Sequence, residues 1–195
     1  MTSIREHFNV PSPNAIETEL RRISLKQGCS HVVKSTLFVI ITIIAIFVIV
    51  SVTVLPVFKI NSDSMSPTFN KGDIVATLRS SDVKTGDVIA FYYNNKVLVK
   101  RVIAKSGDEV MLDWYGNLTV NGEKIDEPYI SKKAYGEANV TFPYTVSAGK
   151  VFVMGDERTG SIDSRNTEIG CISQEQIIGK LILRIWPLNA ISAVK

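Results

Sequence analysis

The first long pattern along the chain is an apolar stretch without a charged residue. It runs from Ser35 to Leu55, and its apolar side chains occupy every face of a helix rather than one stripe. At about 1.5 Å per helical residue, this length covers the ~30 Å hydrocarbon core of a bilayer. The stretch is also longer than the apolar region of a cleaved signal peptide, and no small-residue cleavage site precedes Pro56. The pattern predicts a transmembrane helix over residues 35–55.

The residues after this stretch follow a shorter period. Runs rich in β-branched and aromatic residues recur between turn signals, which is typical of strands. We expect strands over residues 73–79, 87–93, 96–104, 108–114, 118–120, 150–154 and 176–186. Asn121-Gly122 is a strong hairpin signal, and no long window beyond the span has helical periodicity. The sequence predicts a mainly β protein, an antiparallel, partly closed β-domain on one N-terminal transmembrane helix.

Charge adds an orientation to this picture. Residues 1–34 carry five Lys or Arg against three Glu, and most of these basic residues lie close to the apolar stretch. Basic flanks remain on the cytoplasmic side of a membrane. We therefore expect a cytoplasmic leader over 1–34, the helix over 35–55, and an extracytoplasmic β-rich domain over 56–195, all in the cytoplasmic (plasma) membrane. The outer domain holds 17 basic and 16 acidic residues without a basic stripe, so no nucleic-acid partner is expected.

Histidine and cysteine are scarce in the part predicted to lie outside. His7, His31 and Cys29 all belong to the leader, and Cys171 is the single member of this group beyond the span. A zinc site built from His and Cys therefore cannot be assembled in the outer domain. A Ser-His-Asp or Cys-His arrangement lacks its base there as well. We expect neither a metal nor a cofactor.

A hydrolase in this domain would need another base, and a lysine kept neutral by burial beside a hydroxyl is the economical choice. Ser64 lies in a polar segment where Pro67 fixes φ and small residues favour a tight turn. Lys100 follows the apolar residues Val97-Leu-Val, which would bury its aliphatic stem. A solvated surface lysine is the alternative interpretation of that position.

Four segments resemble, in order, the sequence boxes of bacterial type I signal peptidases. They are Ser64-Met-Ser-Pro-Thr68, Gly86-Asp-Val-Ile-Ala-Phe91, Lys100-Arg-Val-Ile-Ala-Lys-Ser-Gly-Asp108 and Gly155-Asp-Glu-Arg-Thr-Gly-Ser-Ile-Asp-Ser-Arg165. The resemblance extends from Lys59 to Trp186, and the single span resembles the short form of Gram-positive members. It implies a membrane-anchored serine endopeptidase that cleaves signal peptides from exported preproteins, with small residues at substrate positions −1 and −3. The partners implied are these signal peptides and the lipid bilayer.

The resemblance also implies roles for individual residues. Ser64 is implied as the nucleophile and Lys100 as the general base of a Ser/Lys dyad. The backbone N–H of Ser64 and the hydroxyl of Ser62 are implied as oxyanion-hole donors. The remaining implied residues are a hydroxyl that orients the lysine and a supporting ion pair, Ser161, Asp163 and Arg165.

The chain departs from the family pattern at two positions. Asp63 stands where many relatives have Gly, which raises the question of the local backbone geometry. Glu157 stands where Asn is usual, and an ionised carboxylate accepts hydrogen bonds but cannot donate one.

Two other functions compete with this interpretation. A self-cleaving Ser/Lys protease of the repressor type shares the dyad, but it acts in the cytoplasm and the transmembrane span argues against it. A non-catalytic, membrane-anchored β-domain that binds an exported partner would use Ser64 and Lys100 as ordinary turn and strand residues. The apolar residues beside Ser64 belong either to the core or to a surface resting on lipid, and these are Pro56, Val57, Phe58 and Phe69.

Overall fold

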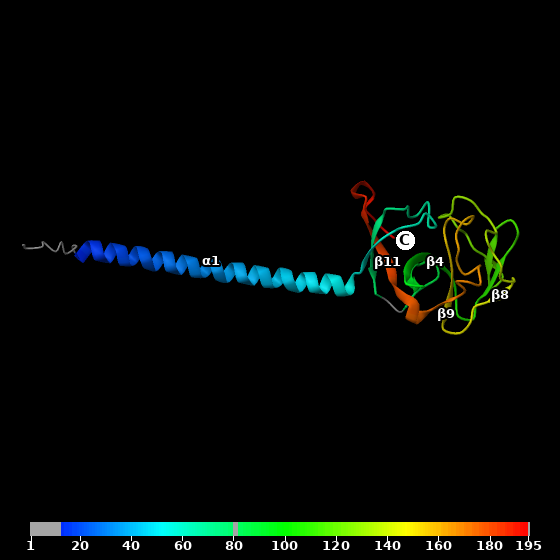
Figure 1. The fold of residues 1–195 in the computed structure, drawn as a ribbon, viewed down its shortest axis with the longest axis horizontal. Helices are drawn as coiled ribbons and strands as arrows, with labels where there is room; N and C mark the ends of the chain where they lie inside the picture. Colours follow the sequence, from blue (N-terminus) through cyan, green and yellow to red (C-terminus); the bar gives the residue numbers. More distant parts are fainter. Residues whose placement is uncertain (1–12, 80–81, 195) are drawn as a thin grey trace, which may run out of the picture. The chain divides into compact units, whose positions relative to one another are not determined.

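The computed structural model describes residues 13–79 and 82–194 (Figure 1). The chain forms two compact units, Met1–Ile49 and Val50–Lys195. The charges that the sequence places before residue 13 lie outside the described residues.

Helix α1 is the main element of the first unit. It runs from Pro13 to Val54, so it begins before the predicted span. Proline is well tolerated in the first turn of a helix, and no further proline occurs before Pro56, where a helix must end. Within α1 the segment Val32–Ile49 is long and apolar enough to cross a membrane, and none of it is buried in the chain. The predicted N-terminal apolar helix, suitable as a membrane anchor, is confirmed.

The second unit contains two antiparallel sheets. Neighbouring strands of the larger sheet follow the order β1 (Val57–Lys59), β2 (Ile74–Leu78), β11 (Ile177–Trp186), β3 (Val88–Tyr93), β4 (Lys96–Lys105), β9 (Lys150–Met154) and β10 (Ile172–Ser173). Strand β12 (Ser192–Ala193) pairs with β11. The smaller sheet has the order β7 (Glu123–Lys124), β6 (Leu118–Val120), β5 (Glu109–Leu112) and β8 (Tyr144–Thr145). In Figure 1 the strand β8 lies at the end of this unit away from β11.

The predicted mainly antiparallel β-domain is confirmed. Each expected run contains a strand, and two 3₁₀ turns, Gln174–Gln176 and Leu188–Ala190, flank β11. The predicted hairpin joins β6 to β7, and Asn121 and Gly122 adopt φ values of 53° and 79°, as a tight two-residue turn requires. The short strands β1, β7, β8, β10 and β12 were not expected.

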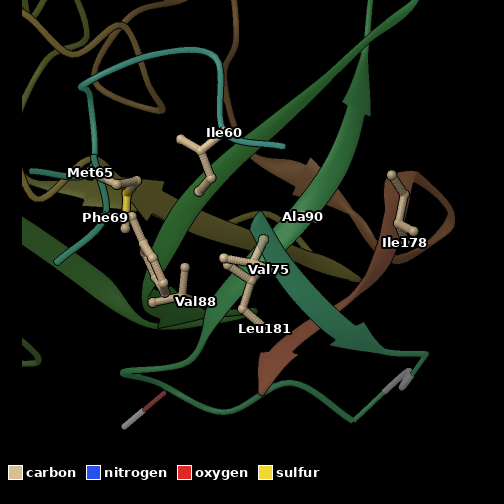
Figure 2. Close-up of a cluster of buried hydrophobic side chains, with 8 residues drawn as sticks. All are labelled: Ile60, Met65, Phe69, Val75, Val88, Ala90, Ile178 and Leu181. Carbon is tan, nitrogen blue, oxygen red and sulfur yellow. The ribbon is translucent and has the colours of Figure 1, made fainter. Parts of the chain in front are cut away.

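One hydrophobic cluster holds the loop between β1 and β2 against the larger sheet. Met65 and Phe69 of this loop are 1% and 2% exposed. Figure 2 shows them among the buried side chains of the sheet, which include Val75, Val88 and Leu181. Burying side chains of this size stabilises a fold by roughly 1.5–3 kcal/mol each. The loop that carries Ser64 is therefore anchored on both sides of its central turn.

Candidate active site

Ser64 and Lys100 are delivered by two different elements. Ser64 lies in the loop between β1 and β2, whose ends are joined by backbone hydrogen bonds from Ile60 N to Asp73 O and from Gly72 N to Ile60 O, both 2.8 Å. Lys100 lies in the middle of β4 and pairs with Ile89 of β3. Strand β9 pairs with β4 only from Arg101 onward, so the N-terminal half of β4 has an open edge.

Ser62, Ser64 and Lys100 line one cleft of about 910 Å³. One part of its wall comes from β1 and the following residues, 57–61, and another from residues 96–99 of β4. Ser64 is half-buried, whereas Lys100 is only 3% exposed. The nucleophile and base candidates therefore face a shared space large enough for a peptide segment.

The amine of Lys100 has a hydroxyl as its partner. Lys100 Nζ lies 2.8 Å from Ser161 Oγ, and Ser161 Oγ donates to Asp163 Oδ2 at 2.9 Å. Among the described residues, no carboxylate lies within ion-pair distance of Nζ. Burial lowers the pKa of Lys100 to about 8, although the more distant charge of Asp163 opposes the shift. A substantial neutral fraction is therefore accessible near neutral pH.

Asp163 is held ionised behind this hydroxyl. Burial alone would raise its pKa, but hydrogen bonds from Arg165 and from Gly155 N outweigh burial and hold the pKa below its usual value. Arg165 Nε donates to Asp163 Oδ1 at 2.8 Å. Since an ionised carboxylate can only accept, the Ser161 hydroxyl donates to Asp163 and its oxygen accepts from Lys100. One N–H of Lys100 is thus occupied, and its lone pair is left for another partner.

Arg165 is part of the scaffold. Its buried guanidinium also donates to the carbonyl oxygens of Tyr135 and Arg158, both at 2.9 Å, and of Ser161 at 3.3 Å. A guanidinium does not deprotonate in proteins, so it acts as a fixed charge and a fork of donors. It connects the loop that carries Ser161 to the segment around Tyr135.

The two implied oxyanion donors lie next to each other. Ser64 N donates to Ser62 Oγ at 3.1 Å, so the two groups are in direct contact and the N–H is bonded to the Ser62 hydroxyl. The carbonyl of Ser64 is held from the other side by Glu157 N, at 3.2 Å. All six residues singled out from the sequence therefore lie in this cleft or directly behind it.

Asp63 fits its position without a special backbone conformation. It does not adopt a positive φ, so the glycine of relatives is not required here. Its Oδ1 accepts from Lys71 N at 2.9 Å and its carbonyl accepts from Ser66 N at 2.9 Å. Asp63 thereby closes the turn that presents Ser64.

Sequence reasoning missed the network that joins these elements. Arg101 donates to Asp156 through Nε at 2.9 Å and Nη2 at 2.7 Å, and the Thr68 hydroxyl donates to the same carboxylate. Both charged side chains are buried. The sequence did contain a signal for Arg101, because it follows Lys100 in an apolar strand. Successive side chains of a strand point to opposite faces, so Arg101 points to the face opposite Lys100. This ion pair ties β4 to the Ser64 loop and to the residues after β9.

Gly155 was also missed. A Cβ at this position would lie 2.1 Å from Ser161 Oγ and 2.5 Å from the carbonyl oxygen of Ser64. Its φ is not in the left-handed region, so the glycine is needed for close approach rather than for an unusual backbone angle.

The apolar neighbours of Ser64 divide between core and surface. Phe69 is buried in the core, whereas Val57 is 54% exposed and lines the cleft. Pro56 and Phe58 are half-buried.

Comparisons with known proteins agree on one family. Residues 32–186 match the profile of the family described as signal peptidase, peptidase S26. Signal peptidase IB of Staphylococcus aureus is 35% identical over 174 residues, covering 78% of this chain and 85% of that protein. Signal peptidase I of Bacillus caldolyticus is 34% identical over 150 residues, covering 68% and 80%. A signal peptidase I of Enterococcus faecalis, solved by crystallography, is 28% identical and covers 51% of this chain and 97% of its own, with a TM-score of 0.44.

Proposed function

The chain belongs to the S26 family of signal peptidases, serine endopeptidases that cleave signal peptides from secreted preproteins, and we propose that it does so with Ser64 as nucleophile and Lys100 as general base. The observation that carries this assignment is the buried amine of Lys100, which lines the same cleft as Ser64 and has Ser161 as its partner. Family membership excludes the two competing functions, a self-cleaving protease of the repressor type and a non-catalytic binding domain.

The first half of the reaction forms an acyl-enzyme. Neutral Lys100 accepts the hydroxyl proton of Ser64 while Ser64 Oγ attacks the scissile carbonyl carbon. The carbonyl oxygen becomes an oxyanion, which receives hydrogen bonds from the Ser62 hydroxyl and from Ser64 N–H, whose bond to Ser62 Oγ is exchanged for the one to the oxyanion. The Lys100 ammonium then gives its proton to the leaving amine, and the C–N bond breaks. The mature protein departs and the signal peptide remains as an ester on Ser64.

The second half repeats these roles with water. Lys100 takes a proton from a water molecule that attacks the ester carbonyl, and the same two donors stabilise the second oxyanion. Lys100 returns the proton to Ser64 Oγ as the ester bond breaks. The signal peptide leaves with a free carboxylate, and both residues regain their starting protonation states.

Burial makes this base usable at physiological pH. With a pKa of about 8, roughly one Lys100 in ten is neutral at pH 7. A lysine at its reference pKa of about 10.4 would be neutral in fewer than about one molecule in a thousand. Burial therefore raises the neutral fraction of Lys100 at pH 7 by a factor of roughly two hundred.

The membrane anchor places the enzyme with its substrates. We propose that residues 1–34 lie in the cytoplasm, 35–55 in the cytoplasmic membrane, and the catalytic domain over 56–195 outside. The basic leader and the apolar segment of α1 support this orientation. Signal peptides occupy the same bilayer, so the anchor raises their effective concentration at the cleft. Small residues at −1 and −3 are the substrate preference that family resemblance implies.

Substitution of the nucleophile tests the assignment. Ser64→Ala removes the attacking oxygen and adds no bulk, so the purified full-length protein in detergent should fold normally and leave a preprotein uncut. Ser62→Ala removes one oxyanion donor and should lower kcat by about 10-fold to 1000-fold. The measurement is preprotein cleavage on gels, with thermal unfolding as the check on folding.

Ser66→Ala is the matched control, because Ser66 lies in the same loop but does not line the cleft. It should cleave at nearly the wild-type rate. Near-normal turnover by Ser64→Ala would show that the nucleophile has been assigned wrongly.

A further inference from the structure

Glu157 connects the nucleophile to the hydroxyl that holds the base. Its backbone N–H donates to the carbonyl oxygen of Ser64 at 3.2 Å. Its side chain accepts from Thr159 N through Oε1 at 3.1 Å and from Gly160 N through Oε2 at 2.7 Å. These two residues immediately precede Ser161, whose Oγ accepts from Lys100 Nζ.

We propose that Glu157 is a positioning residue that sets the spacing between the Ser64 loop and the Ser161 loop, and thereby aligns the Ser/Lys dyad. The inference rests on the proposed function, in which Ser64 and Lys100 are the reacting groups. Both loops are tied to the same residue, so a shift of its side chain moves the Ser161 hydroxyl relative to Ser64.

A carboxylate suits the two N–H groups better than an amide. Each of its two oxygens accepts one of them, whereas a Gln side chain has one acceptor oxygen and would turn its NH₂ group toward the other N–H. Burial tends to raise the pKa of Glu157, but the hydrogen bonds from Gly160 and Thr159 outweigh it and lower the pKa. Glu157 is therefore ionised at any pH where the enzyme works, and hydrogen bonds to an ionised acceptor are the stronger ones.

The charge of Glu157 also acts on the base. Burial has the largest effect on the pKa of Lys100 and lowers it, as does the charge of Arg165; Asp163, Asp156 and, with the smallest effect, Glu157 raise it. Removal of the Glu157 charge therefore lowers the pKa of Lys100 further. The neutral amine then persists to lower pH. The acid limb of the pH profile, where activity rises with pH, therefore moves to lower pH.

The test compares the full-length wild type with E157Q and E157D in detergent micelles, using a preprotein substrate. For E157Q we expect kcat to fall by about 10-fold to 100-fold, with a much smaller change in KM, because the reacting groups are misplaced after binding. The acid limb of kcat/KM should move to lower pH. E157D keeps the charge and can still bond N–H groups two or three residues ahead. Its acid limb should stay at the wild-type pH, and its kcat should fall by only about 3-fold to 10-fold.

Asp113→Asn is the matched control. Asp113 accepts from Tyr115 N at 2.9 Å and from Asn117 N at 2.8 Å, so it also caps a turn, but in the smaller sheet and outside the cleft lining. It should leave both kcat and the acid limb unchanged. An equal loss of kcat in D113N and E157Q would mean a general loss of stability and would overturn the proposal.

A wild-type kcat in both Glu157 variants, or in E157D alone if E157Q fails to fold, would also overturn it. Failure of the proposed function itself gives a different result, since the wild type would then lack the acid limb or Ser64→Ala would remain active.

Discussion

The proposed reactivity of the buried Lys100 amine depends on the kind of partner that it has. A carboxylate in direct contact would favour the ammonium, whereas the neutral hydroxyl of Ser161 orients Nζ without adding a charge. The charge that raises the pKa of Lys100 most, on Asp163, lies behind that hydroxyl and is paired with Arg165. Desolvation therefore dominates the pKa of Lys100.

Gly155 provides a steric test of this arrangement. In Gly155→Ala the added Cβ would lie 2.1 Å from Ser161 Oγ, so the hydroxyl that holds Lys100 Nζ must leave its present position. We expect kcat to fall by about 100-fold or more, since misplacement near 1 Å has effects of this size. Overpacking should also lower the free energy of unfolding by about 1–3 kcal/mol. Steady-state kinetics and chemical denaturation measure the two effects.

Ser161→Ala serves as the reference for this prediction, because it removes the hydroxyl that the added Cβ meets at 2.1 Å and leaves the second close contact, with the Ser64 carbonyl oxygen at 2.5 Å. The double variant should be no slower than Gly155→Ala alone, as expected for coupled residues. If the two losses of kcat multiply in full, Gly155→Ala acts through its clash with the Ser64 carbonyl oxygen rather than through the Ser161 hydroxyl.

Chemistry-bearing residues could be predicted from the sequence more readily than the residues that hold them. The lack of histidine beyond the leader directed attention to lysine, and family resemblance then selected Ser64 and Lys100. Gly155 and Asp156 gave no such signal. Gly155 matters because other atoms approach it closely, and Asp156 because it pairs with Arg101, 55 residues away. Neither feature is visible in the local sequence pattern.

Elements with their own hydrophobic pattern were the ones that sequence could predict. Strands β3, β4 and β11 have long apolar runs bounded by turn residues, and each appears within a few residues of its expected limits. Strands of two or three residues, such as β8 and β10, are defined by their pairing partners rather than by local sequence. Helix α1 extends back from the apolar segment as far as Pro13, because no residue between Pro13 and that segment ends a helix.

The orientation of α1 leads to a prediction at the level of this element. If the basic leader remains inside, protease added to intact protoplasts should digest the domain over 56–195 and spare an epitope tag placed at the N-terminus. Antibodies against the tag and the domain measure this by immunoblot, and a cytoplasmic protein that survives the treatment shows that the protoplasts are intact.

A domain that remains protected until detergent is added would place it in the cytoplasm. That result would contradict the proposed orientation, but it would not bear on the assignment of Ser64 and Lys100 as the dyad.

The proposed active site is assembled from three segments that are far apart in the sequence. The Ser64 loop, strand β4 and the residues after β9 meet through contacts between positions as distant as Lys100 and Ser161, or Thr68 and Asp156. Such contacts form only when the sheet order places β4 between β3 and β9. The low exposure of Lys100 is therefore a property of the complete domain rather than of strand β4 alone.

The pH dependence of kcat/KM tests the lysine base most directly, because this ratio reports the ionisation of the free enzyme. The pKa of Lys100 is about 8, so kcat/KM for preprotein cleavage should rise about tenfold per pH unit on the acid side and level off above that value. Lys100→Arg should be inactive across the range, since a guanidinium keeps its proton. A profile that is flat from about pH 5 to 9, or substantial activity in Lys100→Arg, would contradict the assignment of Lys100 as the general base.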